Sequence, residues 1–217
     1  MQFRQNFKDW TAWFGSGSQD DFKFERNNEN VQTSEIHAMI KPYPKWDPDS
    51  YARDIMLFKL KKEIQFTGKI NFKDIFLKIF NILDYVMPIC IERFDHIAHG
   101  TQLMVSGFGD TQNREEDSGE SFQASPVLNH VDVLRVSQDV CQNWYGSDHM
   151  LQADQICAGH EEGLKDSCVG DSGGPLVKST YDSSNAVYWY QVGIVSFGFE
   201  CARNCCLFIY KKMTKRI

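Results

Sequence analysis

The sequence predicts an all-β fold of the sandwich or barrel type. Short apolar runs recur between turn-rich stretches, and several alternate polar with apolar residues, as half-buried strands do. Valine, isoleucine, phenylalanine and tyrosine are frequent in these runs, and the pattern is not that of βαβ units. In chain order the runs cover residues 38–43, 54–60, 102–109, 131–137, 174–179 and 188–198.

Composition excludes several classes of protein. The chain has 217 residues, of which 42% are hydrophobic and 24% charged, and this is typical of a globular protein with a core. A net charge of −6 lacks the positive field that nucleic-acid binding requires, so no nucleic-acid partner is predicted. No apolar run approaches roughly 18 residues, so no membrane span is predicted. Residues 1–25 contain no apolar signal core.

The seven cysteines lie scattered along the chain. They form no CxxC pair and lack the Cys/His spacing of a zinc site, so disulfides are favoured and no metal or cofactor is predicted. Disulfides form in oxidising compartments, which predicts an extracellular or cell-surface protein. Because the chain shows no signal peptide, we expect it to be incomplete.

The strongest chemical signal is the segment from Asp166 to Leu176, which reads DSCVGDSGGPL. Glycines around Ser172 allow a sharp turn that leaves its hydroxyl accessible. The N–H groups of Gly170 and Ser172 can converge on an oxyanion. The G-x-S-x-G pattern also occurs in α/β-hydrolases, but that fold needs a histidine after the serine, and all six histidines precede Ser172.

Ordered motifs along nearly the whole chain resemble the trypsin-like serine proteases, the peptidase S1 family with the chymotrypsin fold. The motifs are DIMLFKLKKEIQFT, DYVMPICI, QLMVSGFGDT, QICAGHEEG, DSCVGDSGGPLV and YQVGIVSFGFECAR. The resemblance implies a double β-barrel whose first barrel is incomplete. Residues 1–92 would form a partial N-terminal barrel and linker, and residues 93–217 the C-terminal barrel.

The resemblance also implies catalytic roles. Ser172 would be the nucleophile, and Asp54 would orient a histidine base. Gly170 and Ser172 would supply the oxyanion-hole N–H groups. The implied reaction is hydrolysis of peptide bonds in protein or peptide substrates.

Further roles concern substrate binding and activation. Asp166 would lie at the base of the pocket for the substrate side chain, where a carboxylate favours Arg or Lys. Ser196 and Gly198 would line the site. Asp171 would receive the α-ammonium group that zymogen cleavage creates.

The cysteines fit the same resemblance. It implies a Cys141–Cys157 disulfide and a Cys168–Cys201 disulfide beside the substrate pocket. Cys90 resembles the linker cysteine that ties the catalytic domain to an upstream stem or propeptide. Each bridge would contribute about 2–4 kcal/mol to stability.

The chain departs from the family pattern in several places. The histidine segment, TAAHC-like in the family, is absent, and His37 is the only histidine before Asp54. We therefore expect this polypeptide to be inactive, and we interpret His37 as a strand residue rather than a substitute base. Phe208 and Glu200 stand where the family frequently has glycine, and the Phe208 ring would fill the substrate pocket. The basic tail from Lys211 is predicted to be a solvated end.

Residues 68–83 differ from their surroundings because apolar positions 72, 75, 76, 79, 80 and 83 follow a helical period. An amphipathic membrane-surface helix and an ordinary packed helix are two interpretations. We favour a third, translation of a retained intron, because removing the segment joins KEIQFT to DYVMPICI as continuous family sequence. For the whole chain, the alternative to an enzyme is a catalytically dead homologue that acts as a binding or regulatory protein.

Overall fold

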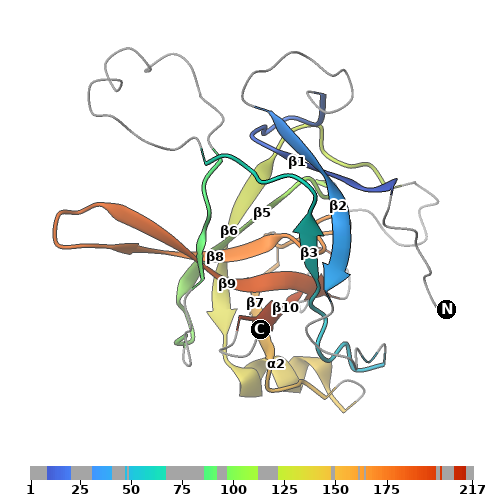
Figure 1. The fold of residues 1–217 in the computed structure, drawn as a ribbon. Coiled ribbons are helices and arrows are strands. Elements are labelled where there is room, and N and C mark those ends of the chain that lie inside the picture. Colours follow the sequence, from blue (N-terminus) through green and yellow to red (C-terminus); the bar gives the residue numbers. More distant parts are fainter. Residues whose placement is uncertain are drawn as a thin grey trace. The chain divides into compact units, whose positions relative to one another are not determined.

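The chain divides into two compact units, Met1–Pro42 with Met56–Pro88 and Tyr43–Ile55 with Ile89–Ile217. The computed structural model (Figure 1) describes residues 9–20, 31–40, 47, 49–66, 86–91, 97–111, 122–147, 150–160, 162–163, 165–198, 201 and 208–213. The predicted insert at 68–83 and Glu200 lie outside these residues.

The first unit contains a three-stranded antiparallel sheet in the order β1-β2-β3. Its strands are β1 (Thr11–Phe14), β2 (Gln32–Ile40) and β3 (Leu57–Leu60). Successive side chains of β2 alternate between the two faces, so Ser34 and Ile36 are buried while Glu35 and His37 are exposed. His37 is therefore an exposed strand residue of this unit.

The second unit contains a closed β-barrel and one edge strand. Its sheet runs β10-β7-β6-β5-β8-β9-β4, and a further pairing between β10 and β9 closes the first six strands of that order into a ring. The strands are β4 (Cys90–Ile91), β5 (Gln102–Gly107), β6 (Asn129–Val136), β7 (Gln155–Gly159), β8 (Pro175–Tyr181), β9 (Val187–Phe197) and β10 (Phe208–Lys212). The predicted all-β class is confirmed.

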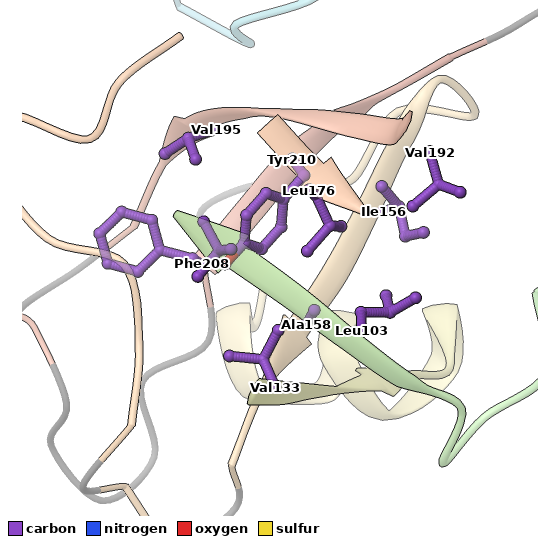
Figure 2. Close-up of a cluster of buried hydrophobic side chains, with 10 residues drawn as sticks. Leu103, Val133, Ile156, Ala158, Leu176, Val192, Val195, Phe208 and Tyr210 are labelled. Atoms are coloured by element: carbon purple, nitrogen blue, oxygen red, sulfur yellow. The ribbon is translucent and has the colours of Figure 1, made fainter. Parts of the chain in front are cut away.

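The barrel interior is filled by apolar side chains from alternate strand positions. Figure 2 shows this cluster, which contains Leu103, Val105, Val133, Ile156, Ala158, Leu176, Val192, Val195, Phe208 and Tyr210. Leu103 and Val105 are 1% and 2% exposed, as the two-residue period of a strand requires. Burying a Val, Leu or Phe side chain stabilises a fold by about 1.5–3 kcal/mol.

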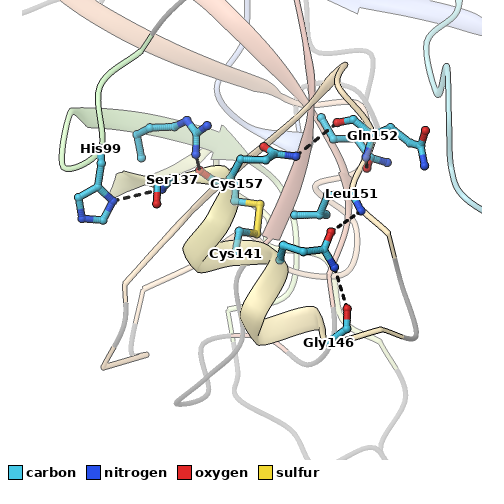
Figure 3. The surroundings of a disulfide bond; sticks show 11 residues. His99, Ser137, Cys141, Gly146, Leu151, Gln152 and Cys157 are labelled. Carbon is cyan, nitrogen blue, oxygen red and sulfur yellow. Dashed lines mark hydrogen bonds between the residues drawn. A yellow bond between two sulfur atoms is a disulfide. The ribbon is translucent and has the colours of Figure 1, made fainter.

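A helix packs against the barrel through a disulfide. Helix α2 (Gln138–Tyr145) carries Cys141, which is bonded to Cys157 on β7 (Figure 3), and both residues are fully buried. The helix ends at Gly146, whose φ of 65° favours glycine. Gln142 fixes the following loop by donating to the Gly146 carbonyl at 2.7 Å and accepting from the Leu151 N–H at 2.8 Å. In the part of the chain that the structure describes, no helix has the length and apolar character needed to cross a membrane.

Candidate active site

Ser172 lies at an exposed position in the tight loop that precedes β8. The loop is closed by two backbone hydrogen bonds, from the Asp171 N–H to the Cys168 carbonyl at 3.0 Å and from the Gly174 N–H to the Asp171 carbonyl at 2.8 Å. The Gly173 N–H donates to the carbonyl of Val195 on β9 at 2.9 Å. These bonds fix the backbone on both sides of the serine, so the barrel presents its hydroxyl at the surface.

Gly170, a predicted oxyanion-hole residue, occupies a position that only glycine fits. Its φ is +95°, which side-chain-bearing residues rarely adopt. An ideal Cβ there would lie 2.7 Å from Cζ of Phe122 and 3.1 Å from Cα of Gly109. The contact with Phe122 escaped the sequence analysis, because no pattern relates the two positions. Phe122 therefore borders the loop that carries Ser172.

The Asp171 carboxylate is held by two backbone N–H groups. Its Oδ1 accepts from Gly109 at 2.8 Å, and its Oδ2 accepts from Cys168 at 2.9 Å. An ideal Cβ on Gly107 would lie 2.0 Å from Oδ1 of Asp171, so the carboxylate occupies the space that a side chain at position 107 would need. The glycines of the GFG motif thus make room for this acid.

A cavity of about 370 Å³ adjoins Asp171. The predicted substrate-pocket residue Asp166 lines the same cavity, together with Lys165, His130 and Gly107. The structure thus brings Asp166 and Asp171 to one cavity. Ser172, Ser196 and Gly198 are not among the residues that line it.

Ser167 links Asp166 to Tyr210 of the barrel core. Its Oδ1 accepts from the Ser167 N–H at 2.8 Å, and the Ser167 hydroxyl pairs with the Tyr210 hydroxyl at 3.1 Å. Ser167 and Tyr210 are both fully buried. Burial raises the pKa of the Tyr210 phenol, and the negative charge of Asp166 raises it further, so the phenol stays neutral and able to hydrogen-bond.

Asp54 is bonded to a second predicted site residue. Ser196, on β9, donates its hydroxyl to Oδ2 of Asp54 at 2.6 Å. The segment before Asp54 is anchored nearby, because Tyr51 stacks on Phe197 with ring centroids 4.4 Å apart. Gln155 of β7 also donates to the Ser50 carbonyl at 3.2 Å. These contacts lie within the second unit and fix the carboxylate beside β9.

Gly198, the other predicted lining residue, follows β9 and lies against the ring of Phe208. An ideal Cβ on Gly198 would be 2.5 Å from Cδ2 and 2.7 Å from Cε2 of that ring. Phe208 is 7% exposed. The sequence analysis predicts that the Phe208 ring fills the substrate pocket. In the structure this ring contacts Gly198.

The structure contains both disulfides that the resemblance implies. Cys168 is bonded to Cys201, and Cys141 to Cys157. Cys90 is a free and exposed thiol on the edge strand β4. The disulfide of Cys168 ties the loop of Asp166 to the chain that follows Gly198.

Comparison with known proteins identifies the family. A family model described as Trypsin matches residues 11–216, and the chain belongs to this family of serine endopeptidases. Over 199 residues it is 31% identical to mannan-binding lectin serine protease 1 of Mus musculus, covering 86% of this chain and 24% of that protein. Over 177 residues it is 34% identical to Trypsin-1 of Astacus astacus, covering 82% of this chain and 62% of that protein.

A third relative has the same proportions. The chain is 30% identical over 197 residues to mannan-binding lectin serine protease 1 of Rattus norvegicus, again with 86% and 24% coverage. It therefore spans about a quarter of the length of the mannan-binding lectin serine proteases that it matches.

Proposed function

We propose that this chain is the catalytic domain of a trypsin-like serine endopeptidase, with Ser172 as nucleophile and Asp54 as the acid that orients the base. The observation that carries the proposal is the 2.6 Å bond between Asp54 and Ser196. This bond attaches the Asp54 carboxylate to strand β9. The Val195 carbonyl of the same strand accepts a hydrogen bond from the N–H of Gly173, the residue after Ser172. A nucleophile loop and a supporting acid are thus both anchored to β9.

The proposed chemistry is acyl transfer. The Ser172 oxygen attacks the scissile carbonyl carbon while a histidine takes its proton, and the resulting oxyanion accepts hydrogen bonds from the Gly170 and Ser172 N–H groups. The C–N bond then breaks, and the histidine protonates the leaving amine. Water releases the acyl group from Ser172 in a second cycle of the same steps.

Among the histidines that the structure describes, we assign none to the role of base. His37 precedes Asp54 and is an exposed residue of strand β2. Without a base the Ser172 hydroxyl keeps its proton, so we propose that the 217-residue polypeptide alone is inactive. A longer product that supplies a histidine upstream of Asp54 would hold the complete set of catalytic groups.

The proposal extends to substrate, location and linkage. The Asp166 carboxylate would favour substrates with Arg or Lys before the scissile bond. The two disulfides support an extracellular or cell-surface location. The exposed Cys90 thiol would bond an upstream stem or propeptide. Asp171, with its cavity of about 370 Å³, would receive the α-ammonium group after activation.

A catalytically dead homologue with a binding or regulatory role is the second candidate. The observation that favours it is the contact of the Phe208 ring with Gly198. A ring that filled the substrate pocket would keep a substrate side chain from binding there. Under this alternative the Asp54–Ser196 bond would persist only as a structural contact.

Labelling with a fluorophosphonate probe tests the proposal, because the probe bonds to an activated serine whatever the substrate side chain. The full-length product should label at Ser172, and Ser172→Ala should abolish the signal while Ser184→Ala, at an exposed surface serine, should not. The 217-residue chain should label at least about 1,000-fold more slowly. Absence of label on the full-length product would support the dead homologue. Equal labelling of the 217-residue chain would overturn its predicted inactivity.

A further inference from the structure

The segment that carries Asp54 lies across strand β10. At one end of it, the Ser50 carbonyl accepts a hydrogen bond from Gln155 of β7 at 3.2 Å. At the other end, Oδ2 of Asp54 accepts from the Ser196 hydroxyl of β9 at 2.6 Å. Strand β10 pairs with both β7 and β9, so it runs between the two anchoring strands. Segment 50–54 therefore crosses β10 from one neighbouring strand to the other.

Lys211 occupies the part of β10 that this segment crosses. It pairs in register with Gln155 of β7 and Ile194 of β9, and paired residues of antiparallel strands share a face of the sheet. Gln155 is the residue that bonds Ser50, so segment 50–54 lies over the face from which Lys211 projects. An outward lysine ordinarily carries its charge to solvent, yet Lys211 is 3% exposed. The covering segment therefore contributes to this burial.

The buried ammonium group of Lys211 lies among charged side chains. Lysine is almost never fully buried without a partner, and Asp154 accepts a bond from Nζ of Lys211. Burial lowers the pKa of Lys211, and both the bond to Asp154 and the negative charge of Asp54 oppose that shift. The positive charge of Arg53 lowers the pKa further. Lys211 is thus placed to interact with two carboxylates, one of which is the predicted catalytic acid.

The backbone just before Asp54 needs such external contacts. Tyr51 and Arg53 have φ values of 49° and 62°, in the left-handed region that residues with side chains rarely adopt. Such conformations persist only where the surrounding structure determines them. Tyr51 is held by stacking on Phe197, with ring centroids 4.4 Å apart. The position of Asp54, next to Arg53, therefore depends on attachments beyond the local chain.

We propose that Lys211 is a positioning residue for Asp54: its buried ammonium group, held by Asp154, attracts the Asp54 carboxylate and keeps it on β9 in its bond with Ser196. This inference rests on the proposed function for the role of Asp54 as the acid that orients the base. Lys211 acts through Asp54 rather than on the substrate. Its positive charge also disfavours a second positive charge nearby, so it helps the histidine base to stay neutral at lower pH.

A double-mutant cycle in the 217-residue chain tests the interaction without requiring catalysis. Lys211→Met removes the charge and keeps the length of the side chain, and Asp54→Asn removes the charge and keeps the shape. Loss of the bond to Asp154 occurs with either residue at position 54, so it cancels in the cycle. In urea unfolding, the double variant should lose less stability than the two single losses combined. The expected coupling is at least about fivefold in the folding equilibrium constant, or about 1 kcal/mol.

Controls separate the charge of Lys211 from its packing. Lys211→Arg keeps the charge, so Asp54→Asn should cost as much in that background as in the wild-type chain. Lys59→Met removes the same charge at an exposed residue of β3 and should be additive with Asp54→Asn. Lys211→Gln replaces Lys211→Met if the methionine variant does not unfold cooperatively, and it should show the same coupling.

The pH profile of fluorophosphonate labelling at Ser172 in the full-length product tests the effect on the base. The labelling rate should fall as the base is protonated at low pH. Lys211→Met should move the midpoint of this fall upward by about half a pH unit, because the base gains a proton more easily when a nearby positive charge is removed. Lys211→Arg should restore the midpoint. A loss of packing alone would lower the rate at every pH and leave the midpoint in place.

Two results would overturn the inference. Additive effects of Lys211→Met and Asp54→Asn on stability would show that the ammonium group does not hold the carboxylate. A midpoint that stays in place in Lys211→Met, with a lower rate at every pH, would leave Lys211 with a structural role only. Absence of label on the full-length wild-type product contradicts the proposed function instead, and the stability cycle then still decides whether Lys211 holds Asp54.

Discussion

The buried hydroxyl pair of Tyr210 and Ser167 gives a quantitative test of the contacts that hold the segment of Asp166 to the barrel core. The two oxygens are 3.1 Å apart, and both residues are fully buried. Tyr210→Phe removes one hydroxyl and leaves that of Ser167 without this partner, and Ser167→Ala does the converse. A buried polar group left unsatisfied costs about 1–3 kcal/mol, so we expect each single change to lower the free energy of unfolding by about 2 kcal/mol.

The double variant should lose much less than the two single losses combined. Replacing both partners by apolar groups of the same shape is nearly neutral apart from the lost hydrogen bond. We therefore expect a total loss of about 1 kcal/mol, which makes the changes non-additive by about 3 kcal/mol. That coupling corresponds to a change of roughly 100-fold in the folding equilibrium constant.

Urea unfolding followed by tryptophan fluorescence at pH 7, with the disulfides intact, measures the cycle. At this pH the Tyr210 phenol is neutral, because burial raises its pKa. Tyr181→Phe makes the same chemical change at a residue that is 67% exposed and should alter stability by less than about 0.5 kcal/mol. Additive effects of Tyr210→Phe and Ser167→Ala would refute the coupling between the two hydroxyls. The inference that Tyr210 holds Ser167, whose N–H bonds Asp166, would then fail.

Three further predictions concern other parts of the second unit. Cys141→Ala/Cys157→Ala should lower the free energy of unfolding by about 2–4 kcal/mol in urea, because the bridge closes a chain separation of 16 residues; an unchanged midpoint would contradict this. Leu176→Ala should cost about 2–5 kcal/mol by the same measurement because Leu176 is fully buried, whereas Leu128→Ala at a 47% exposed residue should cost little. By NMR the Asp182 carboxylate should titrate with a pKa of about 2, and the largest cause of this lowered pKa is the hydrogen bond from the Ser184 hydroxyl. The charged carboxylate therefore stabilises its turn above about pH 4, and this stabilisation is lost as the pH falls through about 2. Ser184→Ala should raise that pKa.

The sequence patterns located the strands that have one polar face. The runs at 102–109, 131–137, 174–179 and 188–198 correspond to β5, β6, β8 and β9. Strands β7 and β10 were not predicted as alternating runs, because all five residues of β7 are buried, as are the first four of β10. A strand that packs on both faces loses the period-two signal.

Lys211 shows how a buried charge misleads sequence analysis. The prediction that the chain becomes a solvated basic tail from Lys211 is wrong at this residue, which is 3% exposed on β10 and ion-paired with Asp154. Burial lowers the pKa of Lys211, and the bond to Asp154 opposes that shift. Lysine is almost never fully buried unless it is paired, and the sequence offers no sign of a partner 57 residues away.

The position of Asp54 depends on contacts that no local pattern contains. Residues on both sides of the segment Tyr43–Ile55 belong to the first unit, yet the segment itself belongs to the second. It is anchored there by the bond to Ser196, 142 residues away, and by the bond of the Ser50 carbonyl to Gln155, 105 residues away. Only the resemblance of whole motifs pointed to Asp54, because a family pattern retains long-range pairings that composition and periodicity do not record. Since the acid and the Ser172 loop are both anchored to β9 within one unit, a substitution that loosens the β1-β2-β3 sheet should leave the Asp54–Ser196 bond in place.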